Sequence, residues 1–248
     1  MKLAIPLLLL ASLPALPKKD LESIGRRIWQ NEAAGKVEGL TDWNQGEHFA
    51  SLGIGHFIWY PAGPKGPFKE SFPSLVSFLK KEGVRLPDWL DEHTECPWPN
   101  RAAFLADATS PRLRQLRDVL ASSLSEQSAF LAQRLERALP SMLELASSQQ
   151  RTKIKSLFER LGSSTKGRFA LIDYVNFKGE GVKASESYSG QGWGLLQVLD
   201  SMPAEGGVRE FSEAAAQVLT RRVKNSPPER REDRWLPGWI SRVRAYSD

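Results

Sequence analysis

A glutamate on an apolar helix face is the first residue of this sequence whose setting suits chemistry. Leu21, Ile24 and Ile28 recur at helical spacing between residues 20 and 34, and Glu32 follows Ile28 by four residues. The apolar side chains and the carboxyl therefore share one stripe, near the end of the expected helix. An apolar setting raises the pKa of a carboxyl, so that it stays protonated near neutral pH, as the acid that cleaves a glycosidic bond must.

A short extended segment after this helix supplies more polar side chains. The segment from Glu47 to Tyr60 is rich in aromatic and branched side chains, which is typical of short strands. Alternate residues of a strand share a face, so Glu47 and Ser51 are expected to point the same way. Glu47 is predicted as the second carboxylate and Ser51 as the holder of a water molecule, with Asp42 in the preceding loop as the alternative carboxylate. Gly53 and Gly55 are expected to leave room for a sugar.

The elements around these residues form a mostly helical chain. Beyond a loop rich in Pro and Gly, apolar residues recur at helical spacing, with an expected break at Pro140 and a markedly apolar helix over 169–177. The predicted fold class is α+β, mostly α-helical, with a small antiparallel β-sheet near the N-terminus. Residues 18–248 are expected to form one domain, with a sheet lobe at about 36–65 and a helical lobe at 66–248.

The N-terminus is typical of an exported protein. Lys2 precedes an apolar run over 3–11, and small and helix-breaking residues follow it. Residues 1–17 are therefore predicted to be a signal peptide, and the protein to be periplasmic or secreted. Ala15 is one candidate cleavage point, and the exact position stays open. The run is too short to cross a bilayer, so no stable membrane span is expected after its removal.

Composition limits the partners and the chemistry. The net charge of +5 favours anionic partners, but an export signal and the lack of a nucleic-acid motif argue against a nucleic-acid role. The single cysteine, Cys96, excludes an intrachain disulfide and is expected to be a structural thiol. The three histidines fit no common zinc spacing, so neither a metal nor a cofactor is expected.

The order of Glu32, a polar loop and Ser51-Leu-Gly-Ile-Gly-His56 resembles the phage-type lysozymes of the lysozyme-like superfamily. In that family a glutamate that ends the first helix is the acid, and a Thr-x-Gly-[Ile/Tyr]-Gly-His strand follows. The resemblance implies that Glu32 is the acid, that Ser51 replaces the water-positioning threonine and that His56 closes the strand motif. The family usually carries an aspartate nearer the acid than Asp42 or Glu47, so the second carboxylate stays open.

The resemblance extends to the second half of the chain. Residues 170–177 are similar to the family's buried helix, which ends in Asn and a glycine-rich turn, and residues 190–197 occupy the place of a cleft-lining loop and helix. The residues expected to bind substrate are Asp42, His56, Gln191, Trp193 and Gln197. Stacking on a sugar ring is the expected role of the tryptophan.

A rival acid lies near this segment. Glu180 precedes Gly194-Leu-Leu-Gln197 in a pattern similar to the Glu…Gly-Leu-Met-Gln of soluble lytic transglycosylases. In that family serine follows the glutamate, whereas Gly181 follows it here.

The resulting prediction is a lysozyme-like muramidase that cleaves β-1,4 linkages in peptidoglycan glycan strands by general acid catalysis from Glu32. It is expected to act as a monomer. A lytic transglycosylase and a chitosanase-like enzyme are alternatives, because chitosanases share the order of acid and sheet. A non-catalytic cell-wall glycan-binding protein is the alternative from another class.

Overall fold

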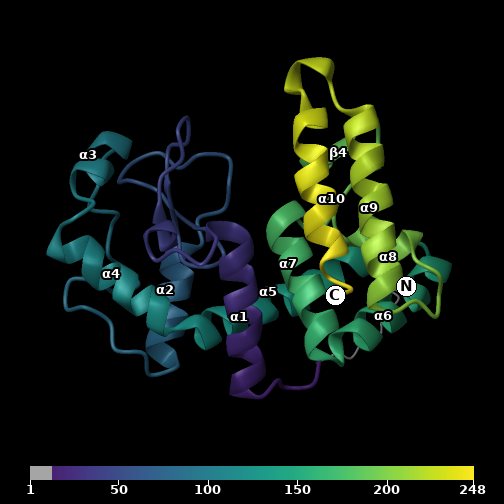
Figure 1. The fold of residues 1–248 in the computed structure, drawn as a ribbon, viewed down its shortest axis with the longest axis horizontal. Coiled ribbons are helices and arrows are strands. Elements are labelled where there is room, and N and C mark those ends of the chain that lie inside the picture. Colours follow the sequence, from purple (N-terminus) through teal and green to yellow (C-terminus); the bar gives the residue numbers. More distant parts are fainter. Residues whose placement is uncertain (1–12) are drawn as a thin grey trace, which may run out of the picture. The chain divides into compact units, whose positions relative to one another are not determined.

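The computed structural model describes residues 13–248, which are mostly helical with a small antiparallel sheet near the N-terminus (Figure 1). The predicted α+β class is confirmed at this level. These residues form two compact units: an N-terminal unit, residues 16–131, and a C-terminal unit, residues 132–248 together with 13–15. The division falls inside α5 (Leu124–Leu145), whereas the sequence suggested a lobe boundary near residue 65. Residues 1–12 of the predicted signal peptide lie outside the described part.

The N-terminal unit combines helices with a three-stranded antiparallel sheet of order β1-β2-β3. Its elements are α1 (Lys18–Ala33), η1 (Glu38–Leu40), β1 (Thr41–Asp42), β2 (Ala50–Leu52), β3 (Phe57–Trp59), α2 (Phe72–Lys81), α3 (Arg101–Ala106), α4 (Pro111–Ser122) and the start of α5. Apolar side chains of the strands form much of the core of this unit, Ala50 and Leu52 on β2 and Phe57 and Trp59 on β3.

Helix α1 buries the predicted apolar stripe. Ile24 and Ile28 are fully buried, which is the periodicity that the sequence indicates. The helix begins after Pro17, and Asp20 lies in its first turn. It ends where Ala34 and Gly35 adopt the left-handed conformation, a common helix C-terminus.

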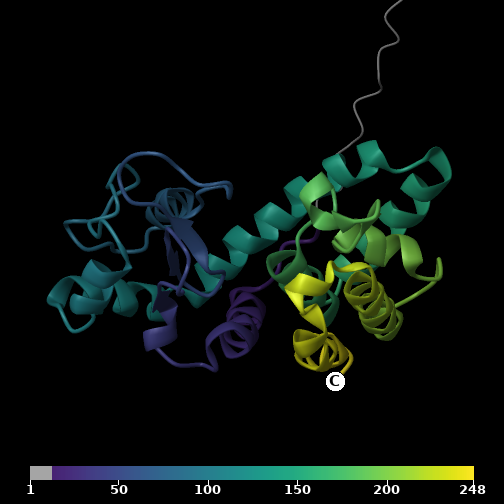
Figure 2. The same cartoon turned by 90° about the horizontal axis from the view of Figure 1, so that it is seen from above.

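The C-terminal unit is helical apart from a short hairpin. Its elements after α5 are α6 (Ser148–Gly162), α7 (Thr165–Lys178), η2 (Ala184–Glu186), β4 (Ser187–Tyr188), β5 (Gln191–Gly192), α8 (Leu195–Ser201), α9 (Val208–Asn225), η3 (Pro228–Arg230), η4 (Glu232–Trp235) and α10 (Leu236–Arg244). Helix α7 is buried along most of its length, as its apolar sequence predicts. Helices α9 and α10 lie side by side (Figures 1 and 2).

A buried ion-pair network fixes α10 on α7. The Asp173 carboxylate is fully buried and accepts hydrogen bonds from Arg242 Nε at 2.9 Å and Nη2 at 2.8 Å. The Tyr246 hydroxyl donates to the same carboxylate at 2.6 Å. Removing one member would leave a buried charge or polar group without its partner, so the network defines the position of α10.

The predicted helix break at Pro140 is wrong, because α5 continues through this residue to Leu145. The break comes at Ser147, whose hydroxyl accepts from the Gln150 backbone N–H while the Gln150 side chain accepts from the Ser147 N–H. This reciprocal cap starts α6. A single proline removes one helical hydrogen bond, and α5 continues through it.

Within residues 13–248, no helix combines the length and the apolarity that a membrane crossing requires. Cys96 is buried, as expected of a structural thiol, and burial raises its pKa to about 11.

Candidate functional site

The candidate acid, Glu32, faces a histidine at the end of α1. Its Oε2 lies 3.6 Å from Nδ1 of His56, and the Glu32 side chain is 14% exposed. The carboxyl follows Ile28 by one helical turn, so burial of the isoleucine brings the carboxyl to the edge of the core. The carboxyl and the imidazole lie close together but beyond hydrogen-bond length, and the remaining exposure of both side chains leaves access for a ligand.

Backbone geometry presents the His56 imidazole to this carboxyl. His56 has a positive φ of 48° and lies in the turn between β2 and β3, where its N–H donates to the Gly53 carbonyl at 3.2 Å. A left-handed conformation is uncommon for any residue other than glycine, although histidine adopts it more readily than most. Such strained residues gather at functional sites, which supports His56 as part of the site.

Gly53 and Gly55 serve packing rather than sugar access, so the expectation that they leave room for a ligand is wrong. Both are buried. Gly53 has a φ of 69°, and a Cβ there would overlap Oε1 of the buried Gln127. A Cβ on Gly55 would lie 2.7 Å from the Phe57 ring. The two glycines allow the turn to lie tightly on the core.

Gln127, which lies on α5, fixes this turn by a hydrogen bond. Its Oε1 accepts from the Ile54 N–H at 3.0 Å, and its Nε2 donates to the Leu120 carbonyl at 2.7 Å. Sequence reasoning missed this residue, because a single glutamine in a helical pattern carries no signal that its partner lies 73 residues earlier.

Asp42 and Ser51 form a second pair of polar residues in the same unit. They are register partners in the antiparallel pair of β1 and β2, so their side chains share one face of the sheet. Ser51 is buried, and no described residue hydrogen-bonds its hydroxyl. Asp42 is half-buried, and its Oδ1 accepts from the Trp43 N–H at 2.8 Å. This face therefore offers a carboxylate beside a hydroxyl.

Glu47 does not share that face through strand parity, so this prediction is wrong. Strand β2 begins only at Ala50, and Glu47 lies in a turn before it. Its Oε2 accepts from Asn44 Nδ2 at 3.1 Å, and its backbone carbonyl accepts from Trp43 Nε1 at 2.9 Å. The side chain therefore stabilises the loop, and Asp42 is the carboxylate that faces Ser51.

Strand β1, which carries Asp42, is anchored by arginines that sequence reasoning also missed. Arg101 Nε donates to the Trp43 carbonyl at 2.7 Å, and Arg117 Nε donates to Thr41 Oγ1 at 2.8 Å. Burial lowers the pKa of Arg117, which the negative charge of Glu38 partly opposes. These contacts give β1 a fixed position despite its length of two residues.

The remaining predicted substrate-binding residues belong to the C-terminal unit. Trp193 is 6% exposed, with the Arg222 guanidinium carbon 4.1 Å and the Tyr188 ring 4.6 Å from its ring. The expectation that Trp193 stacks on a sugar is wrong, because both neighbours are protein groups and the ring has little free surface. Gln191 is exposed and accepts from Asn225 Nδ2 at 3.2 Å.

Gln197 fixes a glycine-rich turn. Its Oε1 accepts from the Gly194 N–H at 2.9 Å, and its Nε2 donates to the Gly181 carbonyl at 3.0 Å. The Leu196 N–H donates to the Glu180 carbonyl at 3.0 Å. The end of α7 and the start of α8 are thus in direct contact beside Glu180.

The Glu180 side chain is half-buried, and its negative charge acts on Arg134 of α5. Burial lowers the pKa of Arg134, and Glu180 opposes this shift. The C-terminal unit therefore holds its own acidic residue near a glycine-rich turn.

Among residues 13–248, no three His, Cys, Asp or Glu side chains gather in a way that would hold a metal ion. No family model, curated protein or solved structure matches the chain. Function is therefore inferred from the geometry of the side chains described above.

Proposed function

We propose that the chain is a lysozyme-like glycosidase that cleaves β-1,4 linkages of peptidoglycan with Glu32 as general acid. The observation that carries this proposal is the mostly buried carboxyl of Glu32, which ends α1 and faces His56 at 3.6 Å. An acid held in this setting at the edge of a small sheet is suited to protonating a glycosidic oxygen. The resemblance of the Ser51–His56 segment to the phage-type lysozymes points to the same chemistry.

The other residues of the N-terminal unit have complementary roles in this proposal. Glu32 protonates the leaving oxygen, and Asp42 stabilises the positive charge that develops on the sugar or activates the attacking water. The Ser51 hydroxyl holds that water, since it shares the sheet face of Asp42. His56 positions the Glu32 carboxyl. Action on peptidoglycan in the periplasm or outside the cell follows from the predicted signal peptide.

The test uses purified wild-type protein and single variants on isolated peptidoglycan, followed by zymography and mass analysis of the fragments. We expect E32Q to lower the rate by about 10²-fold or more, because the amide cannot supply the proton. D42N is expected to lose activity strongly as well, whereas E47Q should retain most of it. E22Q is the matched control, since Glu22 lies on the same helix with a side chain 44% exposed.

Four outcomes contradict the proposal in different ways. Full clearing by E32Q removes the catalytic assignment, and equal losses in E22Q and E32Q indicate damage to α1 rather than to chemistry. If no variant, including the wild type, clears peptidoglycan but the protein binds it, the chain is a glycan-binding module. Clearing of chitosan but not of peptidoglycan supports the chitosanase-like alternative.

A lytic transglycosylase with Glu180 as acid is the second candidate. It is favoured by the direct contacts between the end of α7 and the start of α8, where Gln197 binds Gly181. In this case E180Q abolishes activity, E32Q does not, and the fragments carry 1,6-anhydro ends instead of reducing ends. Mass analysis of the wild-type digest separates the two reactions before any variant is made.

A further inference from the structure

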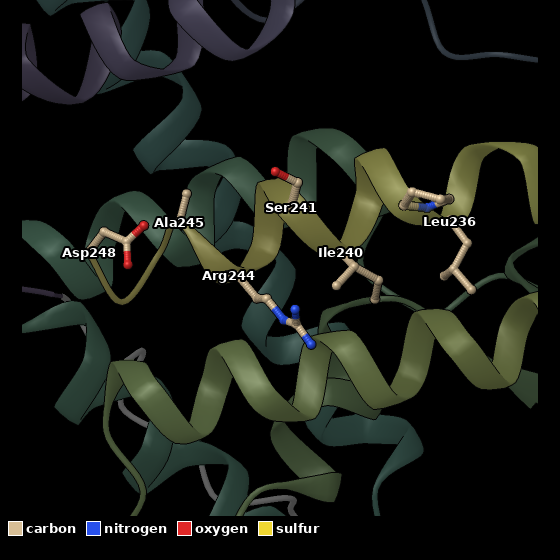
Figure 3. Close-up of a pocket in the computed structure, with 7 residues that line it drawn as sticks. Leu236, Ile240, Ser241, Arg244, Ala245 and Asp248 are labelled. Carbon is tan, nitrogen blue, oxygen red and sulfur yellow. The ribbon is translucent and has the colours of Figure 1, made fainter.

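A groove with basic walls runs between α9 and α10 in the C-terminal unit. It has a volume of about 580 Å³ and is lined by Arg221 and Lys224 of α9 and by Ile240 and Arg244 of α10, among others. A second hollow of about 640 Å³ continues along α10 and shares Ile240 and Arg244 with the first. Figure 3 shows both of these side chains extending from α10 toward the neighbouring helix.

The three cations of this groove lack the carboxylate partners that other arginines of the same helices have. Arg222 of α9 pairs with Glu232 at 2.7 Å, and Arg242 of α10 pairs with Asp173 at 2.8 Å. By contrast, no described carboxylate forms an ion pair with the cations of the groove, Arg221, Lys224 and Arg244.

The side chains of these cations also make few hydrogen bonds. The Arg221 side chain donates to the Gly192 carbonyl at 3.4 Å, a long hydrogen bond. The side chains of Lys224 and Arg244 make no hydrogen bond to any described residue, and both residues are exposed. None of the residues that line the first hollow is acidic, and Asp248 lines only the second. The first hollow thus has three cations and no acidic residue in its lining, which favours anionic ligands.

The residues that line the groove indicate which class of anionic ligand it binds. Ala216 and Ile240 supply apolar surface between the cations, and no aromatic ring lines either hollow. Single-stranded nucleic acids are bound through stacking on aromatic side chains, which this lining does not provide. Carboxylates on short aliphatic residues match both the charge and the apolar floor.

We propose that the groove binds the carboxylate-bearing peptide stems of peptidoglycan. The choice of polymer rests on the proposed function, in which peptidoglycan is the substrate, whereas the preference for carboxylates rests on the groove itself. Arg221 and Lys224 lie about one helical turn apart on α9 and meet successive carboxylates. Arg244 binds from α10, and Ile240 contacts the aliphatic parts of the stem.

The test measures binding of the full chain to purified peptidoglycan sacculi and to chitin, a related glycan without carboxylates. The E32Q background prevents digestion if the proposed function holds. We expect the R221Q/K224Q/R244Q variant to bind sacculi about tenfold more weakly, since each exposed charge pair contributes modestly. The binding should weaken as salt rises, because the contacts are exposed to solvent.

The matched control is R137Q/K155Q/K183Q, which removes the same charge from side chains of the C-terminal unit outside the groove. We expect its affinity for sacculi to stay within about twofold of the parent, because these side chains lie outside the groove. Attraction that depended on total charge alone would weaken equally in both variants. The double variant K224Q/R244Q repeats the test with the two side chains that bond to no described residue. Circular dichroism checks that all variants are folded.

The proposal is overturned if the groove variants and the control bind sacculi equally, or if all proteins bind chitin as tightly as sacculi. It is also overturned if a single-stranded oligonucleotide binds the groove more tightly than sacculi do. Groove-dependent binding by a wild-type chain that never clears peptidoglycan rejects the enzymatic function alone. Clearing that depends on Glu32 without groove-dependent binding rejects the groove alone.

Discussion

Replacement of Gly53 by alanine tests whether the Gly-Ile-Gly turn positions the candidate acid through tight packing. Gly53 has a φ of 69°, and a left-handed conformation costs an alanine roughly 1–2 kcal/mol. The new Cβ would also overlap Oε1 of Gln127, which is fully buried and holds the Ile54 N–H. Overpacking of this kind costs about 1–3 kcal/mol. We therefore expect G53A to lose about 2–5 kcal/mol of unfolding free energy.

Gly83 provides the control that separates these two costs. It has a φ of 78° and lies in the same unit, but a Cβ there would meet nothing within 4 Å. G83A therefore has the conformational cost alone, and both variants share the small benefit of a less flexible unfolded chain. The difference between them, about 1–3 kcal/mol, measures the contact with Gln127.

Urea unfolding followed by tryptophan fluorescence measures both changes. The buried tryptophans Trp43, Trp59 and Trp98 report on the N-terminal unit. Activity on peptidoglycan should fall in G53A more than in G83A, because the turn carries His56 to the Glu32 carboxyl. Equal free-energy losses in G53A and G83A would refute the packing argument and restore the view that Gly53 leaves open space.

Two further predictions concern the C-terminal unit. Burial acts to raise the pKa of Glu232, but the hydrogen bonds from Arg222 and Tyr188, together with nearby positive charges, outweigh it and lower the pKa. Glu232 therefore contributes stability above its ordinary pKa of 4.5, and this contribution is lost as the pH falls through its lower folded pKa. Unfolding free energies measured from pH 6 down to about pH 2 should fall less steeply in E232Q than in the wild type, and parallel profiles would contradict the assignment. Leu13 is 5% exposed and lies against Gly162, so L13A should cost about 2–3 kcal/mol, whereas L145A, at a side chain 61% exposed, should cost little. Equal melting temperatures of L13A and L145A would show that the contact of Leu13 does not contribute to stability.

The same contact bears on the predicted signal peptide. Arg168 Nη2 donates to the Pro14 carbonyl at 2.9 Å, and Leu13 packs on α6. Cleavage after Ala15 would remove both contacts from the C-terminal unit. Mass measurement of the N-terminus of exported protein therefore tests the cleavage point directly.

The sequence by itself determined the parts of this protein that depend on local periodicity. The stripe of Ile24 and Ile28 predicted α1 and placed Glu32 at the edge of the core, because helical spacing fixes which side chains share a face. The apolar run of α7 predicted a buried helix for the same reason. The mixture of many helices with one early sheet, and hence the α+β class, also followed from these patterns.

Tertiary structure decided which polar side chains meet. Strand β2 proved to be three residues long, so parity did not reach back to Glu47, and the register with β1 instead placed Asp42 beside Ser51. Trp193 became a core residue because Arg222, distant in sequence, packs on its ring. Position 53 must be a glycine because the Gln127 side chain, more than seventy residues later in the sequence, leaves no room for a Cβ. Local spacing determines the face on which a residue lies, whereas its partner across the core depends on how distant segments pack.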